Sequence, residues 1–443
     1  MRIYNTLSRK VEEFRPIAGK KVNFFVCGPT VYDFAHIGNA KTYTQFDFII
    51  RYLRARGFDV FYLQNITDLD DKIIARAKEQ GVTWRELSAK YEQIYLEDMK
   101  ALHNLAVTEY ARATDFIPQI VAQVKTLIAK GFAYRASDGI YYDIKKFADY
   151  GKLSGRTEAD QNAGVSRIDE SRDKKNKNDF CLWKFSSADE PSWETELGVG
   201  RPGWHIEDTA ITESVLGSQY DIHGAAVDLI FPHHEAEIAQ MEAASGKSPL
   251  VRVWMHAAFL NINAEKMSKS KGNIMTAREA VAKYGYRLLR FFFISAHYRT
   301  PLDFGDDTLA QAGGALKRLD DFVAHLDEKL EDGSVGELRT KVEGFLDDDF
   351  DTPKALAAIF DFIREQNARG PGGKNVAAYF KELNEIFDFM DFGGKSVPQE
   401  VEKLLAKRDE LRKSGDYAQA DKIRQEIIKM GYTVEDDATR YST

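Results

Sequence analysis

An alternation of strand and helix patterns near the N-terminus constrains the fold more than any other feature. Residues 21–27, KVNFFVC, are apolar and rich in β-forming residues, and they run directly into the loop residues GPT. Residues 37–57 have the pattern of a helix that ends at Gly57, and residues 58–65, FDVFYLQN, predict a second strand. Strand, helix and strand in this order predict a βαβ unit, and therefore a parallel sheet with right-handed crossovers.

The alternation returns in the second half of the chain. Residues 226–231, AVDLIF, predict a strand, residues 233–245 a helix, and residues 251–262 a further strand. Between the halves, residues 131–144 predict a β-hairpin about Asp138-Gly139, and the polar run 154–179 is expected to be a mobile insertion. We therefore expect an α/β fold with a doubly wound parallel sheet that is interrupted by an inserted lobe.

The chain becomes helical after residue 305. Residues 308–330 and 352–367 have apolar residues three and four apart, and Thr352-Pro353 is a good helix start. The GPGG stretch at 370–373 separates two helices, and residues 397–432 predict a charged helical hairpin with its hinge near Gly415.

Composition limits the class of protein. The chain has 443 residues, too many for one ordinary domain, of which 44% are hydrophobic and 29% charged. No apolar run approaches the ~20 residues that would span a bilayer, and the N-terminus lacks an apolar signal core. Two cysteines form no disulfide framework, so we expect a cytoplasmic protein. A net charge of −8 argues against a protein that coats nucleic acid indiscriminately, but it leaves room for a local basic patch.

The stretch CGPTVYDFAHIGNA at 27–40 has the layout of a phosphate-binding site. A strand opens into a Gly/Pro loop and then a helix N-terminus, where free N–H groups and the helix dipole favour an anion. His36 and Asn39 add hydrogen-bonding groups at the same end. The alternative is an ordinary strand-to-helix turn.

The stretch EKMSKSKG at 265–272 is a second candidate. Its lysines Lys266, Lys269 and Lys271, with serines and a glycine, could hold a pyrophosphate while charge develops on it. A solvated charge run is the commoner meaning of such a tract.

A third candidate is a set of potential metal ligands. His233 and Glu237 are four residues apart on an expected helix, so they project from one face and could hold one Zn²⁺ with Cys27 as a thiolate. A His pair at a helix start could instead serve in capping. The full set is Cys27, His205, His223, His233, His234, Glu235 and Glu237.

The C-terminal hairpin carries many basic residues among acidic ones. By itself this pattern fits a solvated amphipathic hairpin better than an RNA contact. The basic residues are Lys403, Lys407, Arg408, Arg412, Lys413, Lys422, Arg424 and Lys429.

The motifs in their order resemble those of the cysteinyl-tRNA synthetases, a family of class I aminoacyl-tRNA synthetases. HIGN after CGPTVYDFA is similar to the first class I signature, and KMSKS is similar to the second. The resemblance runs from the first strand to beyond residue 300 and includes the C-terminal hairpin. The matching stretches are FVCGPTVYDFAHIGNA, NITDLDDKII, GRPGWHIE, YDIHGAAVDLIFPHHEAEIAQ, KMSKSKGN and YRTPLDF.

The resemblance implies one active-site Zn²⁺ that binds the thiol of the substrate cysteine. Cys27, His233 and Glu237 fall on three of the four ligand positions, and Asp208 stands where the family normally has a cysteine. Asp208 preserves the formal charge of the set, because a carboxylate and a thiolate each carry one negative charge. Zn²⁺ also accepts carboxylate oxygen as a ligand. Two alternatives stay open: Asp208 turns outward and His205 replaces it, or the site holds no metal and recognition depends on Trp204 and His223.

The resemblance also implies the other site residues. Cys27, Thr67, Trp204, His223 and Asp228 fall on positions of the amino-acid pocket. The ATP site would contain Gly28, Thr30, His36, Asn39 and Lys269, with Mg²⁺ accompanying ATP. Asn39 stands where the family often has a second histidine. Catalytic roles are expected for His36, Asn39, Lys266 and Lys269.

The implied reaction is the activation of L-cysteine with ATP and its transfer to the 3′ end of tRNA(Cys). A cysteine ligase acting on an amino-sugar and a non-catalytic synthetase-like RNA-binding regulator are the alternatives. The expected partners are tRNA(Cys), L-cysteine and ATP, with no membrane. We expect a monomer, although the sequence gives no direct sign of the oligomeric state.

The expected domain organisation has five parts. They are the first half of the catalytic fold at 1–120, an inserted connective lobe at 121–195, the second half with the KMSKS loop at 196–300, a helical bundle at 301–395, and an anticodon-binding helical hairpin at 396–443.

Overall fold

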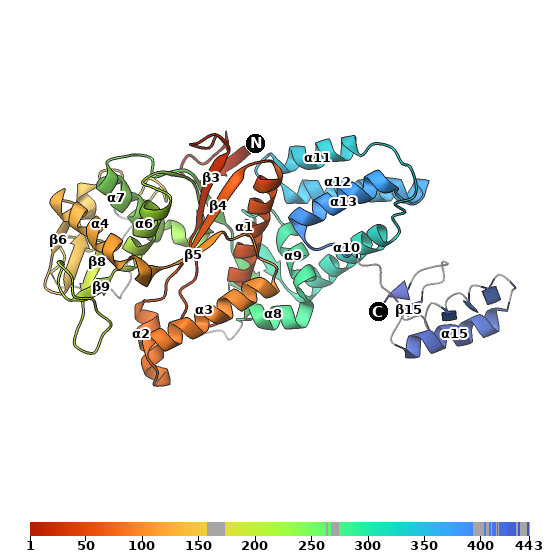
Figure 1. The fold of residues 1–443 in the computed structure, drawn as a ribbon, viewed down its shortest axis with the longest axis horizontal. Coiled ribbons are helices and arrows are strands. Elements are labelled where there is room, and N and C mark those ends of the chain that lie inside the picture. The colour runs from red at the N-terminus through yellow and green to blue at the C-terminus, as the bar shows by residue number, and fades with distance from the viewer. Residues whose placement is uncertain are drawn as a thin grey trace. The chain divides into compact units, whose positions relative to one another are not determined.

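The computed structural model describes residues 1–156, 173–262, 265–266 and 274–392, together with parts of the region 403–442 (Figure 1). The chain divides into two compact units, Met1–Met390 and Asp391–Thr443.

A five-stranded parallel sheet forms the centre of the first unit. Its order is β11 (Val251–Ala257), β10 (Tyr220–Ala226), β3 (Lys21–Val26), β4 (Asp59–Ile66) and β5 (Glu109–Arg112). From β3 the chain continues to β4 on one side, while β10 lies on the other. The expected doubly wound parallel sheet is confirmed, and its switch point between β3 and β10 is where α/β folds place a ligand.

Helices cover both faces of this sheet. Phe24 of β3 packs on Phe46 of α1 (Ile37–Ala55), with ring centroids 5.9 Å apart. Phe25 belongs to a buried cluster on the opposite face, which includes Ile211 of α6 (Trp204–Val215) and Ile238 of α7 (His233–Ser245). Figure 1 shows α1 and α9 (Tyr286–Ser295) on one side of the sheet and α6 and α7 on the other.

The prediction of a strand at 226–231 is wrong. The strand is β10, which ends at Ala226, and residues 227–230 form a short 3₁₀ helix. β10 lacks the apolar pattern by which a buried strand is predicted, because its sequence, YDIHGAA, contains polar residues and a glycine. Asp221 accepts hydrogen bonds from the backbone N–H groups of Ile17 and Asn23, and Gly224 lies so close to Phe46 that a Cβ would come within 2.6 Å of its ring. Tertiary contacts therefore decide where this strand lies.

The strand expected at 251–262 is two strands of different sheets. β11 ends at Ala257, and β12 (Leu260–Ile262) pairs with β13 (Glu265–Lys266) and β14 (Leu302–Phe304). At the break, the backbone N–H of Ala258 donates to the carbonyl of Tyr298, which turns the chain away from the central sheet. A further pair, β1 (Arg2–Asn5) and β2 (Lys10–Glu13), opens the chain.

The inserted lobe is built on an antiparallel sheet with the order β6 (Ala133–Arg135), β7 (Gly139–Tyr142), β8 (Phe180–Phe185) and β9 (Gly200–Pro202). The hairpin about Asp138-Gly139 is confirmed, and its turn is closed by the N–H of Ala136 donating to the carbonyl of Gly139. The helix α4 (Ile117–Ala129) packs beside this sheet. Residues 157–172 of the predicted mobile insertion lie outside the described residues.

Helices make up the remainder of the first unit. Along the chain, α2 (Asp71–Gln80) and α3 (Trp84–Ala101) follow β4 and precede β5. Further on, α8 (Ala277–Tyr284) precedes α9. The last helices are α10 (Asp306–Ala324), α11 (Gly336–Leu346), α12 (Thr352–Arg369) and α13 (Lys374–Phe387). The predicted start at Thr352-Pro353 is confirmed, with Asp351 as the cap.

The second unit contains α15 (Tyr417–Lys429) and the short pair β15 (Thr433–Val434) and β16 (Tyr441–Ser442). The predicted hinge residue Gly415 lies outside the described residues. Among the residues that are described, no helix is both long enough and apolar enough to cross a membrane.

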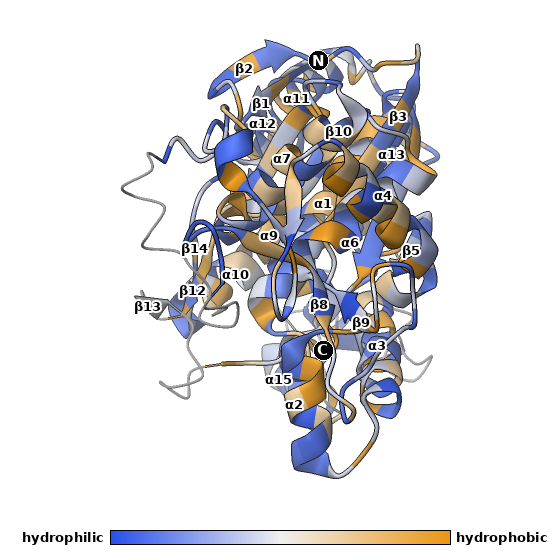
Figure 2. Ribbon diagram, turned by 90° about the vertical axis from the view of Figure 1, so that its left-hand side faces the viewer, coloured by the Kyte–Doolittle hydropathy of each residue, from blue (hydrophilic) through white to orange (hydrophobic). Residues whose placement is uncertain are grey.

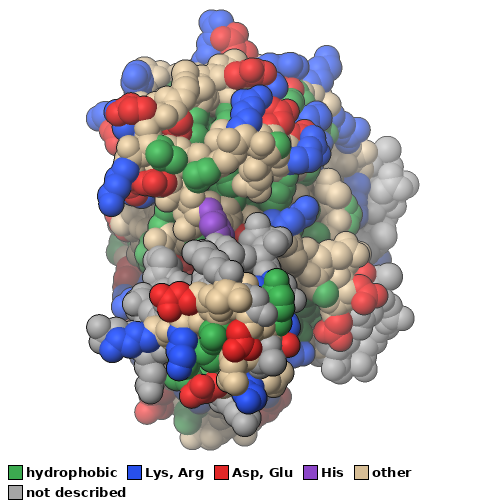
Figure 3. Space-filling model, turned by 90° about the vertical axis from the view of Figure 1, so that its right-hand side faces the viewer, with side chains coloured by type: hydrophobic (Ala, Val, Ile, Leu, Met, Phe, Trp, Pro, Cys, Tyr) green, Lys and Arg blue, Asp and Glu red, His purple; other side chains and the backbone are tan. Residues whose placement is uncertain are grey.

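The colouring by hydropathy matches this layered arrangement. In Figure 2 the outer strand β2 is mainly blue, while orange segments gather among the inner helices and strands. On the face in Figure 3, acidic and basic side chains are interspersed, in keeping with the modest net charge of −8.

Candidate active site

A cavity of about 450 Å³ opens at the carboxyl ends of β3 and β10. Its wall is made by the loop after β3, the start of α1, the end of β4 and the starts of α6 and α7. It therefore lies at the switch point of the sheet. The lining residues named in the sequence analysis are Cys27, Gly28, Thr30, His36, Asn39, Thr67, Trp204, Asp208, Asp228 and His233.

The loop after β3 lies tightly against the end of β4. A Cβ on Gly28 would come within 1.7 Å of the carbonyl oxygen of Asn65, so only glycine fits there. The N–H of Gly28 donates to Oδ1 of Asn65 at 2.5 Å, and the N–H of Val31 donates to the carbonyl of Thr67 at 3.1 Å. These contacts place Cys27, Thr30 and Thr67 along one wall of the cavity.

His36 and Asn39 form a reciprocal cap at the start of α1. The N–H of Asn39 donates to Nδ1 of His36 at 3.2 Å, and the N–H of His36 donates to Oδ1 of Asn39 at 3.3 Å. The cap fixes both side chains where the positive end of the helix dipole meets the cavity, an arrangement that favours a phosphate.

The segment that follows the lysine-rich tract is attached to this helix start. The N–H of Ile37 donates to the carbonyl of Met275, and the N–H of Ala277 donates to the carbonyl of Ala35. The side chain of Lys266 and the whole of Lys269 and Lys271 lie outside the described residues. The described segment that follows the tract, at Met275 and Ala277, is thus held beside the start of α1.

Cys27, Asp208, His233 and Glu237 converge at the cavity, where the first three line the wall. One potential ligand atom from each lies within 4.8 Å of those from the others, and all four residues are buried. Nε2 of His233 lies 3.0 Å from Oδ2 of Asp208 and 3.1 Å from Oε1 of Glu237. Asp208 is therefore turned inward, toward the other three residues. His205 lies behind His233, with their Nδ1 atoms 2.8 Å apart.

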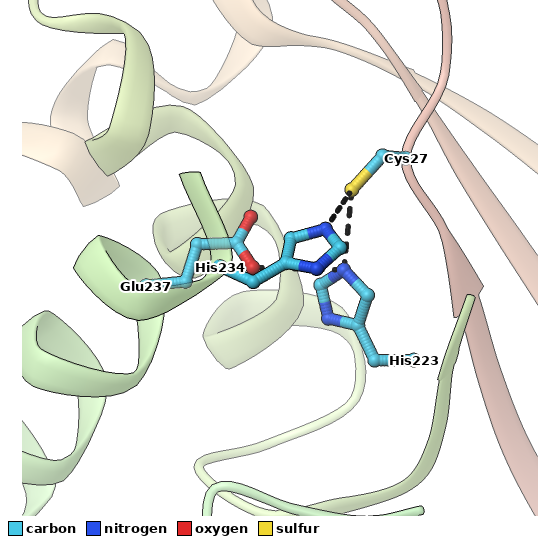
Figure 4. A group of neighbouring side chains, drawn as sticks. All are labelled: Cys27, His223, His234 and Glu237. Atoms are coloured by element: carbon cyan, nitrogen blue, oxygen red, sulfur yellow. Dashed lines mark hydrogen bonds and ion pairs between the residues drawn. The ribbon is translucent and has the colours of Figure 1, made fainter. Parts of the chain in front are cut away.

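Cys27 and Glu237 also belong to a second group, with His223 and His234 (Figure 4). Sγ of Cys27 lies 3.1 Å from Nε2 of His223 and 3.3 Å from Nε2 of His234. Oε2 of Glu237 lies 3.5 Å from Nε2 of His223. Of the residues expected in the amino-acid pocket, His223 alone is absent from the cavity wall and lies beneath it.

The chemistry of these residues fits a divalent cation. Neither oxygen of the buried Glu237 accepts a hydrogen bond of good geometry. Burial raises the pKa of the Cys27 thiol well above its usual value, and the charges of Glu237 and Asp208 raise it further. Burial also raises the pKa of Glu237. Nε2 of His233 contacts both buried carboxylates, and a cation would add the positive charge that these acids and a Cys27 thiolate need together. An ion with oxygen, nitrogen and sulfur ligands therefore suits this site.

Trp204 covers His233 at the mouth of the cavity. The two rings are stacked, with centroids 4.3 Å apart, and Trp204 remains 40% exposed. Asp228 lies in the exposed turn after β10, across the cavity wall from the start of α1. Thr67, Trp204 and Asp228 are thus brought together around one space, as expected of a small-molecule pocket.

Asn65 is the site residue that the sequence analysis missed. Its Nδ2 donates to Oδ1 of Asp208 at 2.6 Å, while its Oδ1 accepts from Gly28. The signal that could have found it was a polar residue at the carboxyl end of the strand expected at 58–65, since such ends carry ligand contacts in α/β folds.

Comparison with known proteins agrees with these features. Residues 13–314 match the family model described as tRNA synthetases class I (C) catalytic domain. Residues 341–390 match the DALR domain, and residues 395–441 match the Cysteinyl-tRNA ligase anticodon binding domain.

Curated relatives cover the whole chain. The cysteine–tRNA ligase of Carboxydothermus hydrogenoformans is 43% identical, and the match covers 98% of each chain. The cysteine–tRNA ligase of Thermococcus onnurineus is 40% identical over 98% of this chain and 97% of that protein.

Solved structures share the fold at much lower identity. Methionyl-tRNA synthetase of Mycobacterium tuberculosis in complex with methionyl-adenylate has a TM-score of 0.61 at 16% identity, covering 84% of this chain and 88% of that one. The leucyl-tRNA synthetase (LeuRS) encoded by agnB2 of Agrobacterium radiobacter K84, in a ternary complex with tRNA and LeuAMS, has a TM-score of 0.61 at 10% identity and covers 85% of this chain and 84% of that one.

Proposed function

The chain belongs to the cysteine–tRNA ligase family, and from that premise we propose which of its residues carry out each part of the reaction. The reaction activates L-cysteine with ATP to cysteinyl-adenylate and then transfers the cysteinyl group to the 3′ end of tRNA(Cys). The convergence of Cys27, Asp208, His233 and Glu237 beside the capped start of α1 is the observation that carries the assignment of roles.

Cys27, Asp208, His233 and Glu237 would hold one Zn²⁺. When bound, the ion supplies a Lewis acid that takes the substrate sulfur as a thiolate, which serine and alanine cannot match. Its support is the donor set itself, with one sulfur, one nitrogen and two carboxylates in a buried group. Trp204 and Thr67 then enclose the substrate above the ligands. Because this discrimination depends on bonding chemistry, the enzyme needs no editing site of the kind that synthetases for small apolar side chains require.

ATP would bind at the loop after β3 and the start of α1. Gly28 allows this loop to lie directly against the end of β4, and Thr30, His36 and Asn39 lie around the helix N-terminus. Mg²⁺ would accompany the phosphates, and Lys266 and Lys269 would also contact them. The chain shortly after these lysines, at Met275, is hydrogen-bonded to the start of α1.

Activation needs positioning and charge stabilisation, and it requires no nucleophile from the protein. A carboxylate oxygen of cysteine attacks the α-phosphorus of ATP, the bond to the bridging oxygen breaks, and pyrophosphate leaves with its electrons. His36, Asn39, Lys266 and Lys269 would stabilise the charge that develops on the phosphates. The 3′-terminal ribose hydroxyl of the tRNA then attacks the carbonyl carbon and expels AMP.

We assign tRNA recognition in part to residues 396–443. Their overlap with the anticodon-binding family model and their separation as a compact unit support this assignment. The same match favours tRNA as the acceptor over an amino-sugar, and full-length similarity to ligases favours an enzyme over a non-catalytic regulator. We place the enzyme in the cytoplasm as a monomer. Both of its cysteines would be reduced thiols there, in keeping with a structure in which both are buried and no disulfide joins them.

Cysteine-dependent pyrophosphate exchange, followed by charging of tRNA(Cys), tests the proposal. Exchange should require cysteine and fail with serine. The chain contains a matched pair of variants, because Cys27 and Cys181 are both buried but only Cys27 lines the cavity. Cys27→Ser should abolish cysteine activation, whereas Cys181→Ser should leave it nearly unchanged. Equal activity of the two variants would contradict the assigned role of Cys27.

A further inference from the structure

We infer that His223 and His234 complete a second position for a divalent ion, closed to substrate, that uses the same thiolate and carboxylate as the proposed Zn²⁺ site. We call Cys27, Asp208, His233 and Glu237 the open set, and Cys27, His223, His234 and Glu237 the closed set. The inference rests on the proposed role of Cys27 and Glu237 as ligands.

The distances in the closed set are close to those of a tetrahedral site. Zn–N, Zn–O and Zn–S bonds of about 2.0 to 2.3 Å place neighbouring ligand atoms roughly 3.4 to 3.6 Å apart. In the closed set Sγ of Cys27 lies 3.1 and 3.3 Å from the Nε2 atoms of His223 and His234, and Oε2 of Glu237 lies 3.5 Å from Nε2 of His223 (Figure 4). Small movements would therefore accommodate an ion.

Both histidines of the closed set are oriented by a partner on the other ring nitrogen. Nδ1 of His223 lies 2.7 Å from the hydroxyl of Tyr220, and Nδ1 of His234 lies 2.8 Å from Nε2 of His256. Metal-binding histidines almost always have such an outer contact, which fixes the ring and directs the free nitrogen toward the ion. Both Nε2 atoms here face Cys27.

Glu237 faces both sets at once. Its Oε1 lies 3.1 Å from Nε2 of His233 in the open set, and its Oε2 lies 3.5 Å from Nε2 of His223 in the closed set. Neither oxygen accepts a hydrogen bond of good geometry from the part of the chain that the structure describes, although the side chain is only 1% exposed. An ion could therefore move between the two sets by changing from one carboxylate oxygen of Glu237 to the other, while it stays bound to Cys27.

The two sets differ in whether their unshared residues line the cavity. Asp208 and His233 line the cavity, whereas His223, His234 and Glu237 do not. Trp254 lies behind both histidines, with its ring centroid 4.3 Å from that of His223 and 5.0 Å from that of His234. An ion in the closed set would hold Cys27 and Glu237 and leave no coordination position facing the substrate thiol.

Asp208 makes the closed set competitive in this chain. Both sets contain one sulfur and at least one carboxylate, but the open set has one imidazole and the closed set has two. Ions that prefer nitrogen over oxygen, such as Co²⁺, Ni²⁺ and Cu²⁺, are therefore drawn toward the closed set. Since the sets share two ligands, they are alternative positions for one ion, and occupation of the closed set excludes cysteine.

Co²⁺ is a suitable probe because its visible spectrum reports ligand type and geometry. The first variant, Asp208→Ala with His233→Ala, removes the open set. It should still bind one Co²⁺ with a thiolate charge-transfer band. L-cysteine binds only the open set, so adding it should draw Co²⁺ from the closed to the open set in the wild type and change the spectrum. The spectrum of this variant, which has no open set, should stay unchanged.

The second variant adds His223→Asn and His234→Gln, which keep a hydrogen-bonding group at each position. Loss of one outer-shell partner alone typically weakens metal binding 10- to 100-fold, so the loss of two direct ligands should weaken Co²⁺ binding by more than about 100-fold. Circular dichroism and thermal unfolding of each variant establish that it is folded.

Three results would overturn the inference: a folded first variant that binds no Co²⁺, an unchanged affinity in the second variant, or a stoichiometry of two ions in the wild type. A wild type that binds no Co²⁺ would refute the proposed metal site as a whole. Wild-type binding without binding by the first variant would refute only the closed set. Pyrophosphate exchange by the wild type tests the proposed enzymatic activity separately.

Discussion

Nδ2 of Asn65 donates a 2.6 Å hydrogen bond to Oδ1 of Asp208, while Oδ2 of Asp208 lies 3.0 Å from Nε2 of His233. Asn65 thereby hydrogen-bonds one carboxylate oxygen of Asp208, and the other oxygen faces the proposed metal position. Its own Oδ1 accepts from Gly28, the neighbour of Cys27. The amide of Asn65 thus contacts both Gly28, the residue next to Cys27, and the carboxylate of Asp208, and it orients both.

Asn65→Ala should therefore weaken Zn²⁺ binding by about 10- to 100-fold, as expected when an outer-shell partner of a metal ligand is lost. Competition with a chelator measures the affinity directly. The effect should be much smaller in an Asp208→Cys background, because a thiolate accepts hydrogen bonds weakly. An equal loss in both backgrounds would show that Asn65 does not act through the carboxylate.

Asp208→Cys should make the site more selective for Zn²⁺. Sulfur is a softer ligand than carboxylate oxygen, so the preference for Zn²⁺ over Mn²⁺ should rise by about tenfold or more, or roughly 1.4 kcal/mol. Metal content after equilibration with both ions checks this outcome. A selectivity equal to that of the wild type would mean that Asp208 is not a ligand.

Lys269→Ala should slow cysteine activation strongly. The lysine is proposed to stabilise charge that develops in the transition state, and one such group is worth about 3 to 4 kcal/mol in other enzymes. The rate of cysteine-dependent pyrophosphate exchange should fall accordingly, while cysteine binding, measured by calorimetry, changes little. An unaltered exchange rate would remove Lys269 from the mechanism.

Deletion of residues 396–443 should separate the two steps of the reaction. The deleted region belongs to the second compact unit, whereas the central sheet and the residues that line the cavity belong to the first. Cysteine-dependent exchange should remain largely intact, while charging of tRNA(Cys) should collapse. Full charging efficiency in the truncated enzyme would show that the anticodon is read elsewhere.

Asp349→Asn should destabilise the fold in a pH-dependent way. Asp349 accepts hydrogen bonds from the N–H of Tyr4, the hydroxyl of Tyr298 and the guanidinium of Arg299. Burial opposes its ionisation, but these partners and His297 hold its pKa below the usual value. At neutral pH the substitution should cost about 2 kcal/mol, the range of hydrogen bonds to a charged group.

The sign of the pH effect follows from the lowered pKa. The ionised form is favoured in the folded state, so its stabilisation is present above the unfolded pKa of about 3.9 and is lost as the pH falls through the folded pKa. Denaturant unfolding of both proteins across this range should show the difference disappearing in acid. Asp348→Asn is a matched control, because Asp348 is exposed and its ion pair with Arg2, at 3.4 Å, lies at the surface.

Local pattern alone determined much of this protein. Apolar period and helix termini predicted β3, α1, β4 and α7 close to their observed bounds. The spacing of His233 and Glu237 placed them on one helix face, and the structure brings their side chains within 3.1 Å. These predictions succeeded because each depends on interactions between residues near in sequence.

The tertiary structure decided the rest. Strand β10 was misplaced because its Asp221, His223 and Gly224 suit contacts with Ile17, Cys27 and Phe46, which no local pattern records. Cys27 and His234 meet across 207 positions of sequence, and Asn65 meets Asp208 across 143. Such contacts depend on the order and register of parallel strands. The sequence therefore determined which potential ligands the chain carries, and the packing of the sheet determined which of them converge in one buried group.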